Sequence, residues 1–350
     1  ASFAATSIFV SICKQYRKAP AGPCRVGIRR ESIMGKTGYF THRDCWKHDM
    51  GPGHPECPAR LDAIEDRLLV TGVGDALERI EVPLATLPQI TRAHSVAHME
   101  HLEALSQRLI EDAPAGGPDH AQIDPDTTLT RFTVLAARRA AGAAIAATDA
   151  VIGGQIDNAF CAVRPPGHHA CRDKAMGFCF FNNIAVAVRH AIEAHGLERV
   201  AVVDFDVHHG NGTEDILSND PRVLMVGIFQ HPFYPYSGTE HPAPNMLNLP
   251  VPAYTKGMDV RELIEACWMP RLEEFKPQMI FVSAGFDAHR DDELGQLRLN
   301  EHDFGWITSR VVDVARRHSK GRIVSMLEGG YNLDALARSV EEHVRVLADL

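Results

Sequence analysis

The sequence Val-Ala-Val-Val-Asp-Phe-Asp-Val-His-His-Gly-Asn-Gly (residues 200–212) joins an apolar run to a cluster of polar side chains. Its first half is short and rich in β-branched residues, which predicts a strand buried on both faces of a sheet. Its second half contains Asp204, Asp206, His208, His209 and Asn211. Carboxylates and imidazoles at the end of a buried strand lose hydration, and a metal ion can compensate for that loss. We therefore expect a metal site at the carboxyl edge of a parallel sheet, where open α/β folds bind their ligands.

Strands and helices alternate along most of the chain. Six segments have the length and composition of buried strands: 38–42, 159–163, 200–205, 223–229, 279–283 and 322–327. Helical patterns precede and separate them, at 59–70, 94–109, about 130–151, 183–195, 258–275 and 303–318. This alternation is typical of an α/β fold with three αβα layers and a mostly parallel central sheet. No internal repeat or linker interrupts it, so one catalytic domain is predicted over residues 34–350.

The composition limits the class of protein. The 350 residues, 45% of them hydrophobic, can bury a large core, and the formal net charge of −9 argues against a general nucleic-acid binder. The eight cysteines form no CxxC pair, which indicates reduced thiols in an intracellular protein. No apolar run approaches the ~20 residues that cross a bilayer. We expect a soluble, cytoplasmic protein without direct nucleic-acid or membrane binding, and homo-oligomers remain an open alternative.

Residues 1–33 differ from the rest of the chain. Six basic side chains there face a single acidic residue, Glu31, and Met34 follows. This basic, acid-poor composition fits either an organelle presequence or a non-native or upstream extension, with the functional chain starting at Met34. We favour the extension and leave the segment out of the fold prediction. A genuine presequence would direct the protein to an organelle.

Four of the predicted strands are followed by clusters of glycine and potentially catalytic residues. The clusters are Arg-Pro-Pro-Gly-His-His (164–169), Asp-Phe-Asp-Val-His-His-Gly-Asn (204–211), Ser-Ala-Gly-Phe-Asp (283–287) and Glu-Gly-Gly-Tyr-Asn (328–332). In a parallel sheet the carboxyl ends of the strands lie on one edge. The clusters should therefore converge into one site.

Asp206, His208 and Asp287 are the candidate metal ligands. Two carboxylates and one imidazole leave a coordination position open for water and substrate, as a catalytic zinc requires. A buried ion pair between Asp206 and His208 is the simpler alternative. The matching Asp287 at a second strand end favours the metal.

His168 and His169 are candidates for acid–base chemistry. A metal-activated water needs a group to accept its proton, and a leaving amine needs a group to protonate it. Each imidazole would need an orienting acceptor, for which Asp204 and Asn211 are available. Adjacent histidines alone are weak evidence, because such pairs are common on protein surfaces.

Three aromatic residues complete the candidate site. Tyr331 follows two glycines, which allow the backbone to turn its phenol toward a developing oxyanion. Phe178, next to Gly177, and Tyr234 could line a narrow apolar approach. On the sequence alone, Phe178 and Tyr234 are equally well explained as core aromatics.

Six motifs together resemble the zinc-dependent histone deacetylase family over about residues 34–350. They are Gly-His-Pro-Glu-Cys-Pro-Ala-Arg-Leu (53–61), Arg-Pro-Pro-Gly-His-His (164–169), Gly-Phe-Cys-Phe-Phe-Asn-Asn (177–183), Asp-Phe-Asp-Val-His-His-Gly-Asn-Gly-Thr (204–213), Ser-Ala-Gly-Phe-Asp-Ala (283–288) and Glu-Gly-Gly-Tyr (328–331). The resemblance implies the arginase-deacetylase fold and one Zn²⁺ per chain, although the residues do not distinguish Zn²⁺ from Fe²⁺.

The resemblance also implies roles for individual residues. Asp206, His208 and Asp287 would bind Zn²⁺. His169 would act as general base and acid, with His168 as an electrostatic partner oriented by Asp204. Tyr331 would polarise the amide carbonyl and stabilise the oxyanion.

A structural potassium site is also implied, on Asp204, Asp206 and the carbonyl of His208. Phe229 is expected at the family position that can supply a serine hydroxyl to that site.

Three positions refine the resemblance. With Asn211 the chain resembles class II-like members, including bacterial histone deacetylase-like amidohydrolases and acetylpolyamine amidohydrolases. An asparagine there would raise the pKa of His169 less than an aspartate would. Leu294 stands where polyamine-specific relatives carry a glutamate. Asp126 matches a rim aspartate that holds the substrate backbone. Phe178, Gly177, Tyr234, Leu294 and Asp126 are therefore the expected substrate-binding residues.

The expected substrate is an acetylated or otherwise acylated lysine in a peptide or protein, or a small acylated amine. An acetylpolyamine deacetylase is the main alternative. An arginase-like ureohydrolase with two manganese ions would need further carboxylates where Gly210 and His289 stand. A zinc-binding acyl-lysine reader without turnover is a third hypothesis, which the presence of Tyr331 disfavours.

Overall fold

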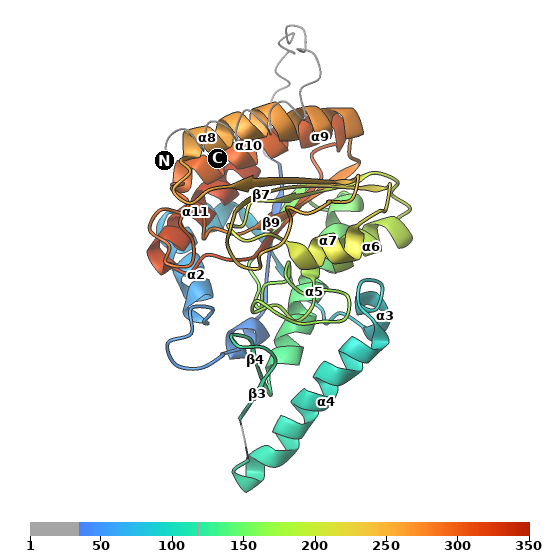
Figure 1. Cartoon of the computed structure of the whole chain (residues 1–350), viewed down its shortest axis with the longest axis vertical. Coiled ribbons are helices and arrows are strands. Elements are labelled where there is room, and N and C mark those ends of the chain that lie inside the picture. The colour runs from blue at the N-terminus through green and yellow to red at the C-terminus, as the bar shows by residue number, and fades with distance from the viewer. Residues whose placement is uncertain (1–34, 118) are drawn as a thin grey trace, which may run out of the picture.

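A computed structural model describes residues 35–117 and 119–350 (Figure 1). The expectation for residues 1–33 falls outside this range. No helix in the described part of the chain has the length and apolar character needed to span a membrane.

The central feature is an eight-stranded sheet in the order β2-β1-β5-β10-β9-β6-β7-β8, in which all neighbouring strands are parallel. Its strands are β1 (Thr37–Thr41), β2 (Leu77–Glu81), β5 (Asn158–Cys161), β6 (Val200–Asp204), β7 (Val223–Gln230), β8 (Met246–Val251), β9 (Met279–Ala284) and β10 (Ile323–Leu327). All residues of β5, β6, β7, β9 and β10 are buried, as expected for a parallel sheet covered on both faces. A short antiparallel hairpin, β3 (His120–Gln122) and β4 (Thr128–Thr130), lies outside this sheet.

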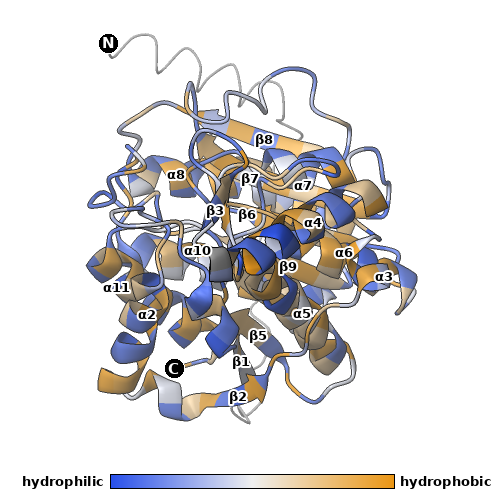
Figure 2. Cartoon of the chain, turned by 90° about the horizontal axis from the view of Figure 1, so that it is seen from below, coloured by the Kyte–Doolittle hydropathy of each residue, from blue (hydrophilic) through white to orange (hydrophobic). Residues whose placement is uncertain are grey.

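Helices cover both faces of the sheet. In Figure 1, α8 to α11 lie over one face, and α5 to α7 lie over the other. The helices are α2 (Ala59–Val70), α3 (Leu87–Ile90), α4 (Val96–Asp112), α5 (Thr133–Ile152), α6 (Asn183–Glu193), α7 (Asn211–Leu217), α8 (Gly257–Leu263), α9 (Met269–Phe275), α10 (Glu301–His318) and α11 (Leu333–Leu347). Hydrophobic residues concentrate on the sheet and on the helix faces turned toward it (Figure 2). The predicted α/β fold with three layers is confirmed.

The sequence also predicted most of these elements, with a few differences. The predicted helix at 258–275 is divided into α8 and α9 by a π-helical turn, Ile264–Trp268. Strands β2 and β8, the β3–β4 hairpin and helices α3, α7 and α11 were not anticipated. The alanine-rich α5 packs closely against the chain that follows β2: a Cβ atom on Gly142 would lie 2.0 Å from the carbonyl oxygen of Pro83.

The strand order explains why the polar clusters meet. Strands β5, β10, β9 and β6 are consecutive in the sheet, and each is followed by one of the four clusters predicted from the sequence. Their carboxyl ends share one edge, so residues 164–169, 204–211, 283–287 and 328–332 come together there.

Candidate active site

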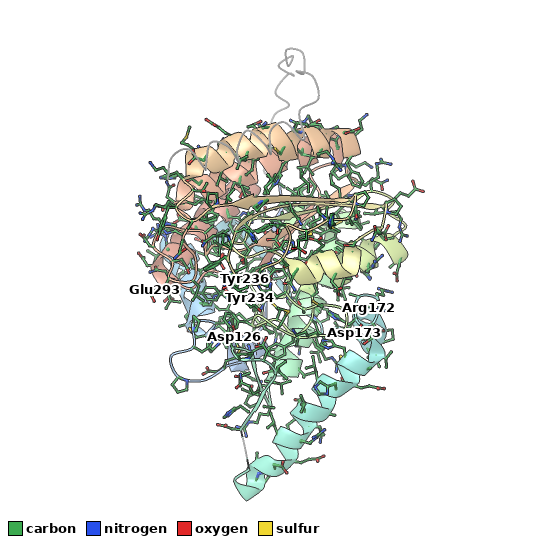
Figure 3. The ribbon with its side chains drawn as sticks, viewed as in Figure 1. Asp126, Arg172, Asp173, Tyr234, Tyr236 and Glu293 are labelled. Carbon is green, nitrogen blue, oxygen red and sulfur yellow. The ribbon has the colours of Figure 1, made fainter. Side chains whose placement is uncertain are left out.

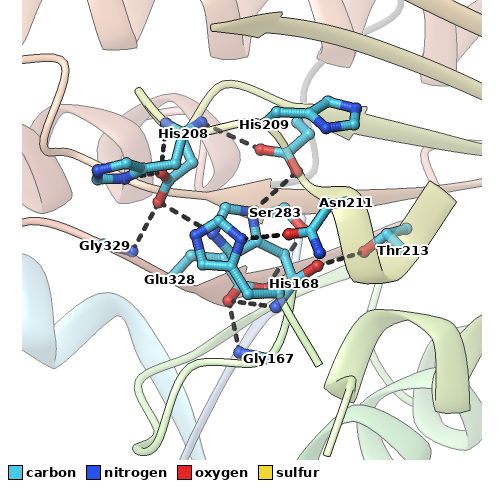
Figure 4. A network of polar contacts seen from close by, with 12 residues as sticks. Gly167, His168, His208, His209, Asn211, Thr213, Ser283, Glu328 and Gly329 are labelled. Carbon is cyan, nitrogen blue, oxygen red and sulfur yellow. Dashed lines mark hydrogen bonds and ion pairs between the residues drawn. The ribbon is translucent and has the colours of Figure 1, made fainter. Parts of the chain in front are cut away.

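The three candidate metal ligands meet between the ends of β6 and β9. The Nδ1 atom of His208 lies 3.0 Å from Oδ1 of Asp206 and 3.2 Å from Oδ2 of Asp287. Both carboxylates are fully buried, and the His208 side chain is 12% exposed. Figure 4 shows this end of β6 with the polar groups around it.

This donor set fits a divalent cation. Oδ1 of Asp287 accepts a hydrogen bond from the Val207 amide (2.9 Å), but its Oδ2 is buried without a hydrogen bond. Burial, and then the negative charge of Asp206, raise the pKa of Asp287 to about 7. A cation would bind this oxygen, which has no hydrogen bond, and would relieve the repulsion between the carboxylates. Carboxylates and imidazole are ligand types that Zn²⁺ binds, and the ligand atoms of these three residues lie within 4.8 Å of one another.

Glycines next to the carboxylates keep the cluster compact. A Cβ atom on Gly329 would lie 2.0 Å from Oδ2 of Asp287, and one on Gly285 would lie 2.0 Å from Oδ2 of Asp206. The Gly329 amide also donates to Oδ2 of Asp206 (2.9 Å). A side chain at either glycine would therefore displace a candidate ligand.

The two histidines at 168 and 169 lie against each other beside this cluster, with ring centroids 4.0 Å apart. Nδ1 of His168 contacts Oδ2 of Asp204 at 3.1 Å, and Nδ1 of His169 contacts Oδ1 of Asn211 at 2.7 Å. Asp204 and Asn211 thus occupy the orienting positions expected from the sequence.

The same partners give the two imidazoles opposite electrostatic environments. Burial opposes a charge on His168, but the carboxylates of Asp206 and Asp204 outweigh it and raise the pKa to about 10. Burial, followed by the proximity of His168 and His208, holds the pKa of His169 well below its usual value. His168 is therefore suited to stay charged, and His169 to stay neutral and accept a proton.

Tyr331 is held by its backbone. Gly330 adopts a φ of 118°, a conformation open to glycine, and Oδ2 of Asp292 accepts from the Tyr331 amide (2.6 Å). The Arg60 guanidinium lies over the phenol ring, 5.0 Å from its centroid. Burial, and then the charge of Asp287, raise the pKa of Tyr331 well above its ordinary value. The phenol therefore remains a hydrogen-bond donor at neutral pH.

Aromatic rings line the approach to the cluster. Phe178 lies edge-on to Tyr331 (centroids 5.8 Å apart), Tyr234 lies edge-on to His169 (5.3 Å), and Phe233 stacks on His208 (5.4 Å). Phe178 and Tyr234 therefore belong to the site and not to a remote part of the core. Phe233 was not anticipated.

The turn at Gly177 and Phe178 brings this wall close to His169. Both residues have positive φ values, 55° and 67°. A Cβ atom on Gly177 would lie 2.5 Å from the His169 ring, so the close approach requires glycine. The Phe178 amide donates to the Thr127 hydroxyl (3.0 Å), which holds the strained turn.

Asp126 lies on the Tyr234 side of the site. Figure 3 shows Asp126 next to the loop that carries Tyr234 and Tyr236. Burial, and then the carboxylate of Asp126, raise the pKa of Tyr234. Burial and the neighbouring Asp124 raise the pKa of Asp126 itself to about 6.

Leu294 is connected to Tyr331 through Asp292. Its amide donates to Oδ1 of Asp292 (2.9 Å), while Oδ2 of the same carboxylate holds the Tyr331 backbone. Leu294 is half-buried in the segment between β9 and α10.

The expectation for Phe229 was wrong. The residue opposite Asp204 on β7 is Gly227, and the Phe229 ring packs on His209 with centroids 4.7 Å apart. Phe229 therefore does not stand beside Asp204, where a potassium-binding serine was expected.

A buried ion cluster supports the site from behind, and its role was not anticipated. Glu56 pairs with Arg164 through both carboxylate oxygens and with Arg60 at 3.2 Å, and all three side chains are fully buried. Arg60 also donates to the carbonyl of Gly330 (2.6 Å). Glu56, Arg60 and Arg164 lie in motifs noted in the sequence, but only the fold brings them together.

Glu328 fixes the turn that carries the two histidines. Its Oε2 accepts from the amides of Gly167 (2.6 Å) and His168 (3.1 Å), as Figure 4 shows. Its Oε1 accepts from the Ser283 hydroxyl (3.3 Å). The end of β10 is thereby connected to the turn after β5.

Comparisons with known proteins identify the family of this chain. The histone deacetylase domain model matches residues 54–347. A histone deacetylase-like amidohydrolase from Pseudomonas aeruginosa is 38% identical over 325 residues, covering 85% of this chain and 82% of that protein. A probable deacetylase from Archaeoglobus fulgidus is 36% identical, covering 85% and 82%. The crystal structure of the HDA15 HD domain superposes with a TM-score of 0.82 at 30% identity, covering 90% of each chain.

The domain match covers most of the chain, and the relatives align with most of their own length. The likeness to the HDA15 HD domain agrees with an arginase-deacetylase fold. The relatives' names describe deacetylases and amidohydrolases, so the chain is a hydrolase of amide bonds. This chain belongs to the histone deacetylase family.

Proposed function

We propose that the protein removes acyl groups from acyl-lysine side chains in a zinc-dependent reaction. The observation that carries the proposal is the close approach of the buried Asp206 and Asp287 carboxylates to His208, where Oδ2 of Asp287 has no hydrogen bond, with the neutral His169 next to them. Asp206, His208 and Asp287 would hold Zn²⁺. The ion would supply Lewis acidity to the amide carbonyl and to the attacking water.

His169 acts as the proton carrier in this proposal. The amide oxygen of Asn211 can only accept, so Nδ1 of His169 carries the hydrogen and Nε2 is free. Nε2 removes a proton from the attacking water and returns it to the leaving lysine amine. The charged His168, held by Asp204, stabilises the negative charge that develops nearby.

Tyr331 supplies the hydrogen bond to the oxyanion. Its raised pKa keeps the phenol protonated, and the backbone contact with Asp292 fixes its position. A donor already in place when negative charge develops lowers the barrier without further reorganisation.

The substrate proposal rests on the lining of the approach. Phe178 and Tyr234 suit an uncharged aliphatic chain such as the acylated lysine stem, and the Asp126 carboxylate is available for a backbone amide of the peptide. Leu294 offers no counter-charge to the ammonium groups of a polyamine. An acetylated lysine peptide or protein is therefore preferred over an acetylpolyamine, which is the second candidate.

Two neighbouring residues argue against a two-metal ureohydrolase. Nε2 of His289 contacts Oε2 of Glu301 (3.1 Å), on the side of α10. A Cβ atom on Gly210 would lie 2.3 Å from Oδ2 of Asp204, which leaves no space for a further carboxylate. Other expectations stay predictions. They are the cytoplasmic location, the homo-oligomeric alternative, the potassium site and the absence of nucleic-acid binding.

Substrate profiling tests the proposal. Zinc-loaded protein is assayed against acetyl-lysine peptides and acetylated polyamines, and a higher kcat/KM on the peptides is expected. Leu294→Glu should shift the ratio toward polyamines by about 5-fold, because an added carboxylate attracts the ammonium groups. Leu294→Gln is the neutral control. Absence of hydrolysis on every substrate would refute the enzyme assignment, and an unchanged ratio would refute the role of Leu294.

A further inference from the structure

We propose that Ser237, His209 and Glu214 form an anchor that positions the loop of residues 231–238 against the active site. The inference rests on the proposed function, because this loop carries the aromatic wall of Phe233 and Tyr234. His209 follows the candidate ligand His208, and the two rings point to opposite sides of the strand end (Figure 4). His209 is 3% exposed. Nothing in the proposed mechanism uses it.

Two hydrogen bonds fix the His209 ring. Nε2 lies 2.8 Å from Oε2 of Glu214, and Nδ1 lies 2.8 Å from the hydroxyl oxygen of Ser237. Burial opposes ionisation of Glu214, but hydrogen bonds from His209 and Asn248 outweigh it and lower its pKa. Glu214 is therefore an acceptor, so Nε2 carries a hydrogen. With that hydrogen on Nε2, the Nδ1 lone pair of His209 can accept the Ser237 hydroxyl hydrogen.

Asn248 on β8 extends the anchor to the next residue of the loop. Its Nδ2 donates to Oε2 of Glu214 (2.8 Å) and to the carbonyl of Gly238 (3.0 Å). Gly238 has a φ of 88°, and a Cβ atom there would lie 2.7 Å from both His209 and Phe229. The close packing of this end of the loop against His209 and Phe229 therefore requires glycine.

The loop is held at both ends, with the aromatic wall between them. Its first residue, His231, donates its amide to the carbonyl of Val251 (2.8 Å), and Ser237 and Gly238 fix its last turn. Between these points the Tyr236 amide donates to the Phe233 carbonyl (2.7 Å). Release of Ser237 would free the end of the loop three residues beyond Tyr234.

The serine–histidine–glutamate order resembles the relay of a serine hydrolase, but the surroundings favour an anchor. A serine nucleophile needs donors that stabilise an oxyanion. In the described part of the chain, the only hydrogen bond of the Ser237 hydroxyl is the one to His209. We therefore assign Ser237 as a positioning residue.

The test compares Ser237→Ala with Ser237→Thr and with Thr239→Ala, an exposed hydroxyl in the same segment. Loss of this partly buried hydrogen bond should raise the KM of Ser237→Ala for an acetyl-lysine peptide by about 3- to 10-fold, with kcat within about 2-fold of wild type. Ser237→Thr keeps the hydroxyl, so its KM should equal that of wild type. Thr239→Ala should also have the wild-type KM. Amide hydrogen exchange of residues 231–238 should accelerate in Ser237→Ala alone.

Hydrogen exchange separates this proposal from the proposed function. Protein that hydrolyses no acylated substrate would end the deacylase assignment, while faster exchange in Ser237→Ala would still support the anchor. Unchanged exchange in that variant would overturn the anchor whatever the activity. Covalent labelling of Ser237 by a fluorophosphonate probe would also overturn it, because the serine would then be a nucleophile.

Discussion

Two clusters of aspartate and histidine in this protein have similar composition but different environments. Asp206, His208 and Asp287 meet at buried strand ends, whereas Asp149 of α5 meets His190 of α6 and His195 just beyond it, with Asp149 and His195 exposed. In the second cluster, Oδ1 of Asp149 accepts from Nε2 of His190 (2.7 Å) and of His195 (2.6 Å), and the Asp149 side chain is 50% exposed.

The difference lies in which polar atoms are already satisfied. Nη1 of Arg92 lies 2.5 Å from Nδ1 of His190, and because arginine only donates, His190 must carry its hydrogen on Nε2. That hydrogen goes to Asp149, so His190 has no free lone pair for a metal. Oδ2 of Asp287, by contrast, is buried without a hydrogen bond and lies 3.2 Å from Nδ1 of His208, itself a candidate ligand. A buried carboxylate oxygen without a hydrogen bond indicates a metal site more specifically than the residue types alone.

The largest effect is expected for Asp287→Asn. The amide keeps the shape of the carboxylate but removes its charge, so the metal content of purified protein should fall from one ion per chain toward zero. Deacylase activity should fall by ~10³-fold or more, because the Lewis acid is lost. Metal content is measured by mass spectrometry after dialysis. An unchanged metal content would show that this cluster does not bind the ion.

Tyr331→Phe distinguishes the contribution of the metal to catalysis from that of the side chains that contact the substrate. Only the phenol hydroxyl is removed, so metal content should stay at one ion per chain. Loss of an oxyanion donor should lower kcat by ~10²–10³-fold. Steady-state kinetics on an acetyl-lysine peptide measure the effect, and a nearly normal kcat would exclude Tyr331 as the donor.

Asn211→Asp changes the pH dependence more than the maximal rate. A carboxylate beside Nδ1 of His169 favours the charged imidazole and raises its pKa. Because the base must be neutral, the acidic limb of the kcat/KM profile should move up by about one pH unit. Activity at pH 6 then falls relative to activity at pH 8. If the acidic limb of the Asn211→Asp profile stayed at the same pH as in wild type, a group other than His169 would be responsible for it.

The elements that the sequence predicted are those whose burial leaves a continuous pattern. Strand β6 is buried at every residue and reads as an apolar run. Strand β2 forms an edge of the sheet, and three of its five residues are exposed, among them Glu78 and Arg79. Its sequence therefore resembles a loop. Helix α7 was not predicted because its first residues belong to the motif that begins at Asp204.

The candidate site could be predicted because parallel strands bring their carboxyl ends together. Asp206 and Asp287 are separated along the chain, but β6 and β9 are neighbours in the sheet. The contacts that support the site leave no comparable pattern in the sequence. Glu56 and Arg164 are 108 residues apart, and the pairing of His209 with Ser237 depends on how one loop folds back.

The smallest effect is expected for Asp149→Asn, which tests the cluster of Asp149, His190 and His195 directly. Each histidine retains a carbonyl oxygen as acceptor, and the side chain is half-exposed, so the free energy of unfolding should change by less than ~1 kcal/mol. Because His190 has no lone pair free, metal content should remain at one ion per chain and kcat/KM within about 2-fold of wild type. His195→Ala is the matched variant. A second ion bound by the wild type and lost from both variants would contradict the difference drawn between the clusters, since satisfied hydrogen bonds would then not have excluded a metal.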